Sequence, residues 1–237
     1  MTILTEITLE QFIKVCPKNS VKLQNNKLPF IEKLLVKRFC TQEKIAKEVG
    51  CSRRYIGLIF DGKRNPNIKL ATQVCTLTSI HFNELIERIY PKGHPDGSYI
   101  FPSSFPINLN ENIAAIIGHS FGDGHLNKVF AYSNTSNELI ESARIDVKKL
   151  PIYNITSNCF EHNGTNIRFS TLVRDILICA SGPKGSKVLQ KTFVPDWILH
   201  GADSIKASFL QSIFDDEACI AIDKNEISLG FSKDSNF

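Results

Sequence analysis

The sequence predicts an α+β protein, in which an all-α N-terminal part precedes a part where helices alternate with short strands. Between positions 41 and 80, apolar residues recur at helical spacing. Further along, two helical stretches at 116–126 and 209–218 share a pattern of small and acidic residues. Short segments of strand-like composition flank a helical pattern at 137–149. Together these features predict a helical N-terminal part followed by a part of mixed helices and strands, in which the second stretch repeats the first.

Capping residues divide the N-terminal part into successive helices. Thr41 is a plausible N-cap, and Gly50 suits the end of the helix that follows. Ser52 begins the next helix, in which Ile56 and Ile59 supply the buried side. Further helices are expected at 28–39, 68–76 and 83–90.

The stretch 41–80, with its GKRNP loop, resembles the helix-turn-helix of the Cro and phage-repressor family. In that family the start of the third helix enters the major groove, and a glutamine opening the second helix contacts a backbone phosphate. Arginine reads guanine with two hydrogen bonds, whereas loop cations hold phosphates. The resemblance implies that double-stranded DNA is the partner, contacted by Gln42, Ser52, Arg53, Arg54, Tyr55, Lys63 and Arg64.

The two later stretches each place a small residue five positions before an acid. Gly118 precedes Asp123, and Ser212 precedes Glu217. Small residues let two helices approach closely, so we expect the stretches to pack face to face and parallel. Their carboxylates would then lie side by side at the negative ends of the helices, a conflict that a divalent cation would resolve. Oxygen ligands suit Mg²⁺ (or Mn²⁺), so Asp123 and Glu217 are the predicted metal ligands.

These stretches, IIGHSFGDGHL and FLQSIFDDEA, resemble the paired signature helices of the LAGLIDADG homing endonucleases. The resemblance implies an αββαββα domain that is followed by an incomplete second repeat. The resemblance implies a site-specific DNA endonuclease of intron or intein mobility, with Asp123 and Glu217 as catalytic acids. Mg²⁺ would polarise the scissile phosphate and activate water for double-strand hydrolysis. His119, four residues before the acid, is expected to face away from it.

The second stretch departs from that family's pattern. Ser212, Asp216 and Ala218 stand where small residues or glycine are usual, and the chain stops after the start of the second half, which looks truncated. The alternative function is therefore a non-cleaving DNA-binding transcriptional regulator built on a degenerate LAGLIDADG domain.

In the same family the hairpin after the first signature helix reads DNA. Alternate side chains of a strand share a face, so one face could present Asn127, Lys128, Tyr132 and Asn134, joined by Arg168 from a later strand.

Charge is unevenly distributed along the chain. Residues 1–100 carry 16 Lys and Arg against nine Asp and Glu, whereas 101–237 carry 12 against 15. The N-terminal part is therefore expected to attract a polyanion.

Composition excludes several classes of protein. No segment is long and apolar enough for a membrane span, and the N-terminus lacks a signal-peptide pattern, so a cytoplasmic protein without membrane contact is expected. Seven scattered cysteines without a CxxC pair predict neither a disulfide framework nor a zinc site. A chain with both signature halves complete would be a monomer, and the sequence leaves the oligomeric state of this chain open.

Composition shifts suggest the domain boundaries. The predicted divisions are a helix-turn-helix DNA-binding domain at 1–90, a Pro- and Gly-rich linker at 91–109, a first LAGLIDADG half at 110–202 and the start of a second at 203–237.

Overall fold

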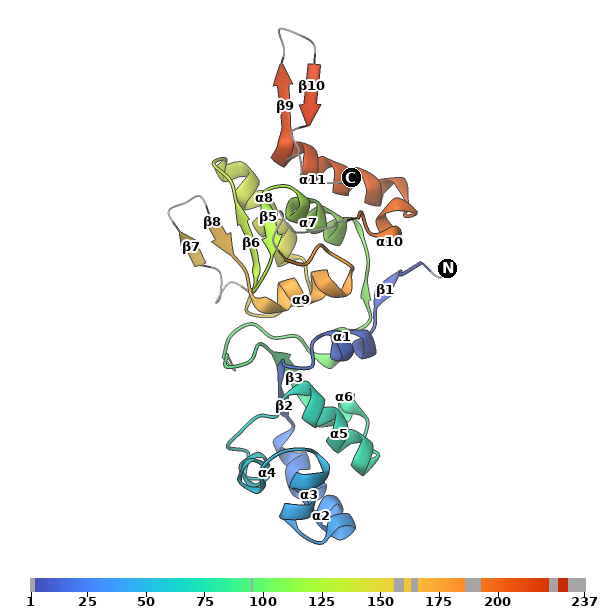
Figure 1. Cartoon of the computed structure of the whole chain (residues 1–237), viewed down its shortest axis with the longest axis vertical. Helices are drawn as coiled ribbons and strands as arrows, with labels where there is room; N and C mark the ends of the chain where they lie inside the picture. The colour runs from blue at the N-terminus through green and yellow to red at the C-terminus, as the bar shows by residue number, and fades with distance from the viewer. Residues whose placement is uncertain are drawn as a thin grey trace. The chain divides into compact units, whose positions relative to one another are not determined.

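A computed structural model describes residues 3–94, 96–155, 160–162, 166–185, 193–221 and 226–229. The α+β class is confirmed, since helices and small antiparallel sheets make up the chain (Figure 1). Contacts divide it into a helical unit, Cys16–Phe105, and an α/β unit, Met1–Val15 with Pro106–Phe237. None of the described helices is long and apolar enough to cross a membrane.

The division differs from the boundaries expected from the sequence. The first 15 residues belong to the α/β unit, where β1 (Glu6–Ile7) pairs with β4 (Ile107–Asn108). Residues 91–105 belong to the helical unit, because Ile89 and Ile100 exchange backbone hydrogen bonds of 2.8 and 2.9 Å. The boundaries after Val15 and after Phe105 are therefore set by pairing between distant segments and not by local composition.

Helices of the helical unit begin where capping residues allow. Thr41 and Ser52 accept hydrogen bonds from the third backbone N–H beyond them, as does Asn67. Ile45, Ile56 and Ile68 are almost fully buried beneath these helices. In chain order the helices are α2 (Leu28–Phe39), α3 (Gln42–Glu48), α4 (Arg53–Phe60), α5 (Ile68–Thr78) and α6 (Phe82–Leu85), with 3₁₀ turns at Asn25–Lys27 and Pro102–Ser104.

The helical unit was predicted to be all-α, but it also contains a two-stranded sheet. The predicted helix at 83–90 is α6 followed by strand β3 (Ile86–Tyr90), so the helical prediction is corrected there. Strand β3 pairs antiparallel with β2 (Ser20–Leu23), with Ser20 opposite Tyr90. The buried Ile86 and Ile89 gain a hydrogen-bonded partner strand about 65 residues away, which outweighs the local helical pattern.

The α/β unit has the predicted αββαββα order. Its elements are α7 (Glu111–Phe121), β5 (Gly124–Leu126), β6 (Phe130–Ser133), α8 (Asn137–Lys148), β7 (Phe160–His162), β8 (Asn166–Arg168) and α9 (Thr171–Cys179). The strands form an antiparallel sheet in the order β5-β6-β8-β7. Helix α1 (Leu9–Val15) packs on α9.

Beyond α9, the order helix–strand–strand begins again. After α10 (Asp196–Leu199) come α11 (Asp203–Glu217), β9 (Ala218–Ala221) and β10 (Glu226–Leu229), and the two strands pair antiparallel. The remaining part of the predicted second half, 230–237, lies outside the described residues.

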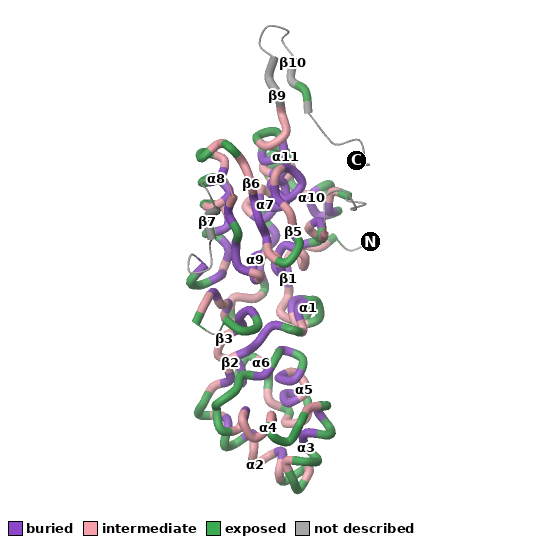
Figure 2. The backbone as a smooth tube through the Cα atoms, turned by 60° about the vertical axis from the view of Figure 1, so that its left-hand side comes forward, coloured by how far each residue is buried: buried purple, intermediate pink, exposed green. Residues whose placement is uncertain are grey.

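Helices α7 and α11 pack closely and in parallel, as predicted. Ser204 donates to Glu111 at the N-terminal ends, and the Asp123 N–H donates to Asp216 at the C-terminal ends. A Cβ on Gly118 would lie 2.6 Å from the Phe209 carbonyl oxygen, so the two backbones nearly touch. Helix α7 is buried along most of its length (Figure 2).

Candidate functional site

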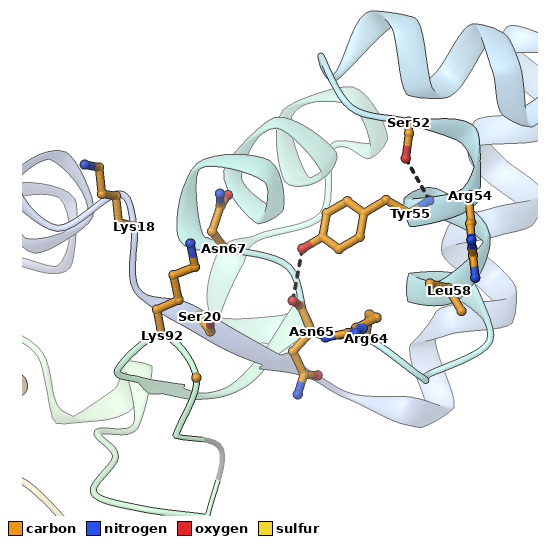
Figure 3. Close-up of a pocket in the computed structure, with 11 residues that line it drawn as sticks. Lys18, Ser20, Ser52, Arg54, Tyr55, Leu58, Arg64, Asn65, Asn67 and Lys92 are labelled. Atoms are coloured by element: carbon orange, nitrogen blue, oxygen red, sulfur yellow. Dashed lines mark hydrogen bonds between the residues drawn. The ribbon is translucent and has the colours of Figure 1, made fainter.

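The helical unit contains a surface pocket of about 790 Å³ lined by basic and neutral side chains, which we call the cationic pocket. Its cations are Lys18, Arg54, Arg64 and Lys92, all exposed. None of the described residues that line it is acidic, so the pocket has a net positive charge. The other lining residues are Ser20, Ser52, Tyr55, Leu58, Asn65, Asn67 and Gly93 (Figure 3).

One wall of the pocket is the start of α4 with the loop after that helix. Ser52 caps α4, and Arg54 follows two positions later. The Tyr55 hydroxyl donates to the Asn65 carbonyl at 3.2 Å, which ties the loop to the helix (Figure 3). Burial raises the pKa of Tyr55, so the hydroxyl keeps its proton to a higher pH than a solvent-exposed tyrosine would. The loop carries Arg64 into the pocket.

The facing wall comes from the ends of the β2–β3 sheet. Lys18 precedes β2, and Lys92 follows β3. Backbone hydrogen bonds join this wall to the loop, since Val21 donates to Pro66 at 2.9 Å and Ile68 donates to Asn19 at 2.8 Å. The two walls are therefore held at a fixed separation by main-chain contacts.

Only some of the DNA contacts expected in this unit line the pocket. Ser52, Arg54, Tyr55 and Arg64 do so. The remaining three lie against acids: Arg53 is 2.8 Å from Glu43, Lys63 is 3.0 Å from Asp61, and Gln42 donates to Glu32 at 3.0 Å. Sequence reasoning missed Lys18 and Lys92, whose only local signal is the Pro-Lys dipeptide that each completes.

The α/β unit holds a second polar group of residues, the carboxylate cluster, centred on Asp216. The Asp216 side chain is fully buried and accepts a hydrogen bond of 2.5 Å from the Tyr132 hydroxyl. It also accepts from the Asp123 N–H at 3.3 Å, and His119 Nδ1 lies 3.2 Å away. His119 was expected to face away from this end of the helix, but it points into the cluster because α11 brings Asp216 against that side of α7.

The predicted acids Asp123 and Glu217 occupy different surroundings. Asp123 accepts a hydrogen bond of 2.8 Å from Asn134 and lines a pocket of about 460 Å³ with Asp215 and Asp216. Glu217, the last residue of α11, is partly buried and does not line that pocket.

Several carboxylate oxygens beside Asp123 already accept hydrogen bonds. Asp216 already accepts from Tyr132 and the Asp123 N–H, and Asp123 Oδ2 accepts from Asn134. Among the described residues, no three His, Cys, Asp or Glu side chains group in a way that could hold a metal ion. The Mg²⁺ or Mn²⁺ site at Asp123 and Glu217 stays a prediction.

The residues expected to read DNA from the hairpin are not all on the surface. Asn127, Lys128 and Arg168 are exposed, and Asn134 is partly buried. Tyr132 is fully buried, so its hydroxyl serves the carboxylate cluster rather than the surface. The three exposed residues remain predicted contacts.

Tyr132 should make the α/β unit less stable as the pH rises into the alkaline range. Burial raises the pKa of Tyr132 far above its usual value, and the hydrogen bond to Asp216 and the Asp216 charge add to the shift. Above about pH 10 the unfolded state loses this proton while the folded state keeps it, so the free energy of unfolding should fall by up to about 1.4 kcal/mol per pH unit. Urea unfolding between pH 8 and 11 should show a shallower decline in Tyr132→Phe, and an equally steep decline would contradict this origin.

No family model matches the chain. The chain is similar to the glutamine–fructose-6-phosphate aminotransferase (isomerizing) of Methanocaldococcus jannaschii, with 24% identity over 228 residues. The match covers 94% of this chain but 20% of that protein. The chain thus spans about one fifth of the length of the relative that it matches.

This similarity contradicts the prediction that the chain is a LAGLIDADG homing endonuclease with a Cro-type helix-turn-helix domain. The matched protein is named as an aminotransferase, not as a nuclease or a transcriptional regulator. The endonuclease function, its regulator alternative and the link to intron or intein mobility are therefore corrected. The motif residues have a structural role in the fold, since Gly118 and Ser212 allow close helix packing and Asp216 is satisfied by internal donors.

Proposed function

We propose that the helical unit binds double-stranded DNA through the cationic pocket. The observation that carries this proposal is that four exposed cations, and no acid, are found among the pocket-lining residues that the structure describes. A duplex carries one negative charge per ~1.7 Å of its axis, and its neutralisation by Lys and Arg releases counterions. The pocket therefore offers a favourable, salt-dependent site for the phosphate backbone.

The side chains paired with acids near the pocket fit the same proposal. The ion pairs Arg53–Glu43 and Lys63–Asp61 are more than half exposed, and such pairs contribute little to stability. Arg53 and Lys63 could therefore leave Glu43 and Asp61 and bind a phosphate at little cost in free energy. Arg54 and Arg64 need no exchange, since they already line the pocket.

A sugar phosphate is the second candidate ligand. The similarity to a protein named for fructose 6-phosphate favours it, although the match covers only one fifth of that protein. A phosphate monoester also fits a basic pocket, but it offers one anionic group to four cations. We therefore place duplex DNA first.

A cytoplasmic location is part of the same proposal. The described cysteines Cys16, Cys40, Cys51, Cys75 and Cys179 are free thiols, which suits a reducing compartment where DNA is accessible.

The double variant Arg54→Ala/Arg64→Ala tests the proposal. We expect the native chain to bind a labelled duplex with a dissociation constant that rises steeply with salt, in the range of about 10⁻⁴ to 10⁻⁶ M at physiological salt. Loss of two phosphate contacts should reduce the slope of log K against log salt by about 1.8. Fluorescence anisotropy over a series of salt concentrations measures both quantities.

The matched control is Lys33→Ala/Lys37→Ala, which removes two exposed cations from α2 that do not line the pocket. It should leave most of the affinity and the slope in place. Fructose 6-phosphate is added as a competitor in a separate arm. Displacement of DNA by millimolar sugar phosphate would favour the second ligand, and absence of salt-dependent binding by the native chain would overturn the DNA proposal.

A further inference from the structure

We infer that Lys18 and Lys92 form a phosphate-binding clamp that holds the DNA backbone from the side opposite Arg54 and Arg64. The inference rests on the proposed DNA binding and adds a second contact wall to it. Figure 3 shows the two lysines on segments across the pocket from Arg54.

The antiparallel register brings the two lysines to the same end of the sheet. Ser20 pairs with Tyr90; Lys18 lies two residues before Ser20, and Lys92 lies two residues after Tyr90. Each lysine lies in a turn just outside the sheet, one closed by a hydrogen bond from the Asn19 N–H to Cys16 at 3.2 Å and the other by one from the His94 N–H to Pro91 at 3.1 Å. Pro17 and Pro91 precede the lysines, and a proline has no N–H to donate to a strand ladder, so the lysines lie outside the sheet.

Lys18 and Lys92 add two positive charges to a pocket that also holds Arg54 and Arg64, and a bound anion would offset the mutual repulsion of these cations. The next cation along β2 shows the usual solution, since Lys22 pairs with Glu87 across the strands at 3.2 Å. Within the described part of the chain, no ion pair joins Lys18 or Lys92 to an acid, and the cationic pocket that they line has no acidic wall. The missing counter-charge is what a bound phosphate would supply.

The clamp fits an extended polyanion better than a single phosphate. Its cations lie on two walls, and backbone hydrogen bonds from Val21 and Ile68 fix the position of one wall relative to the other. A sugar–phosphate backbone that passes between the walls presents phosphates to both. Contacts of this kind position the duplex without reading bases, so they should be equally strong on any sequence.

The double variant Lys18→Ala/Lys92→Ala in the full chain tests the clamp. The salt slope of duplex binding should fall by about 1.8, and the affinity should drop by the same factor on two duplexes of unrelated sequence. Lys33→Ala/Lys37→Ala serves as the charge-matched control and should leave the slope close to native. Circular dichroism of each variant checks that the fold is retained.

Acylation of lysine amines gives a second readout that needs no variant. With native protein, a saturating random-sequence duplex should protect Lys18 and Lys92 from an amine-acylating reagent, while Lys33 and Lys37 react as before. A native slope in the double variant, or no protection in a protein that binds DNA, would overturn the clamp alone. Absence of salt-sensitive binding by the native chain would overturn the proposed function as well.

Discussion

Replacing Asp216 by alanine should lower the free energy of unfolding by about 2–6 kcal/mol, because each of the two donors left without an acceptor costs about 1–3 kcal/mol. The Asp216 side chain has no solvent exposure and accepts hydrogen bonds from the Tyr132 hydroxyl and the Asp123 N–H. Truncation leaves both donors, and His119, without the acceptor they face. Chemical unfolding at neutral pH measures the loss.

The neighbouring residue provides a matched control. Asp215 is exposed, so Asp215→Ala removes the same carboxylate from the same helix and should change stability by no more than about 0.5 kcal/mol. Asp216→Asn retains an acceptor for Tyr132 without the charge and should fall between the two. Equal stabilities of the Asp215 and Asp216 alanine variants would show that the cluster contributes nothing to the fold.

Local features of the chain could be predicted from the sequence. Thr41 and Ser52 cap α3 and α4 because a hydroxyl before an apolar helical run satisfies an orphan N–H wherever the chain folds. Gly118 and Ser212 predict the close approach of α7 and α11, since small residues at helical spacing have few other uses. These inferences need no knowledge of distant partners.

The rest depends on pairing across the sequence. The sequence of β3 has a helical pattern, and only its pairing with β2 makes it a strand. The same pairing brings Lys18 and Lys92 to one end of the sheet. In the sequence, Asp216 is a departure from the LAGLIDADG pattern. Its role is visible only in the fold, where Tyr132, 84 residues earlier, donates a hydrogen bond to it. The predicted endonuclease function rested on the small and acidic residues of the stretches 116–126 and 209–218. These small residues explain how α7 and α11 pack, but they do not by themselves indicate a reaction.

Replacing Gly118 by alanine should destabilise the α/β unit by about 1–3 kcal/mol, the usual cost of forcing an extra group into a packed interior. The new Cβ would lie 2.6 Å from the Phe209 carbonyl oxygen and 2.8 Å from Ser212 Cβ. Neither the backbone carbonyl nor a Cβ can rotate away, so α7 and α11 must separate. That separation would also loosen the contact between the Phe121 and Phe209 rings, whose centroids are 5.5 Å apart.

Gly57 in α4 gives the comparison that isolates the effect of close packing. A Cβ there would meet only the Gln42 side chain, at 3.6 Å, which is an ordinary contact. Gly57→Ala should therefore stabilise the helical unit by up to about 1 kcal/mol, because alanine has the higher helix propensity. Opposite signs for the same substitution in two helices would show that the contact with α11, and not helix propensity, requires glycine at position 118; a stabilising Gly118→Ala would show that the two helices are farther apart than their packing indicates.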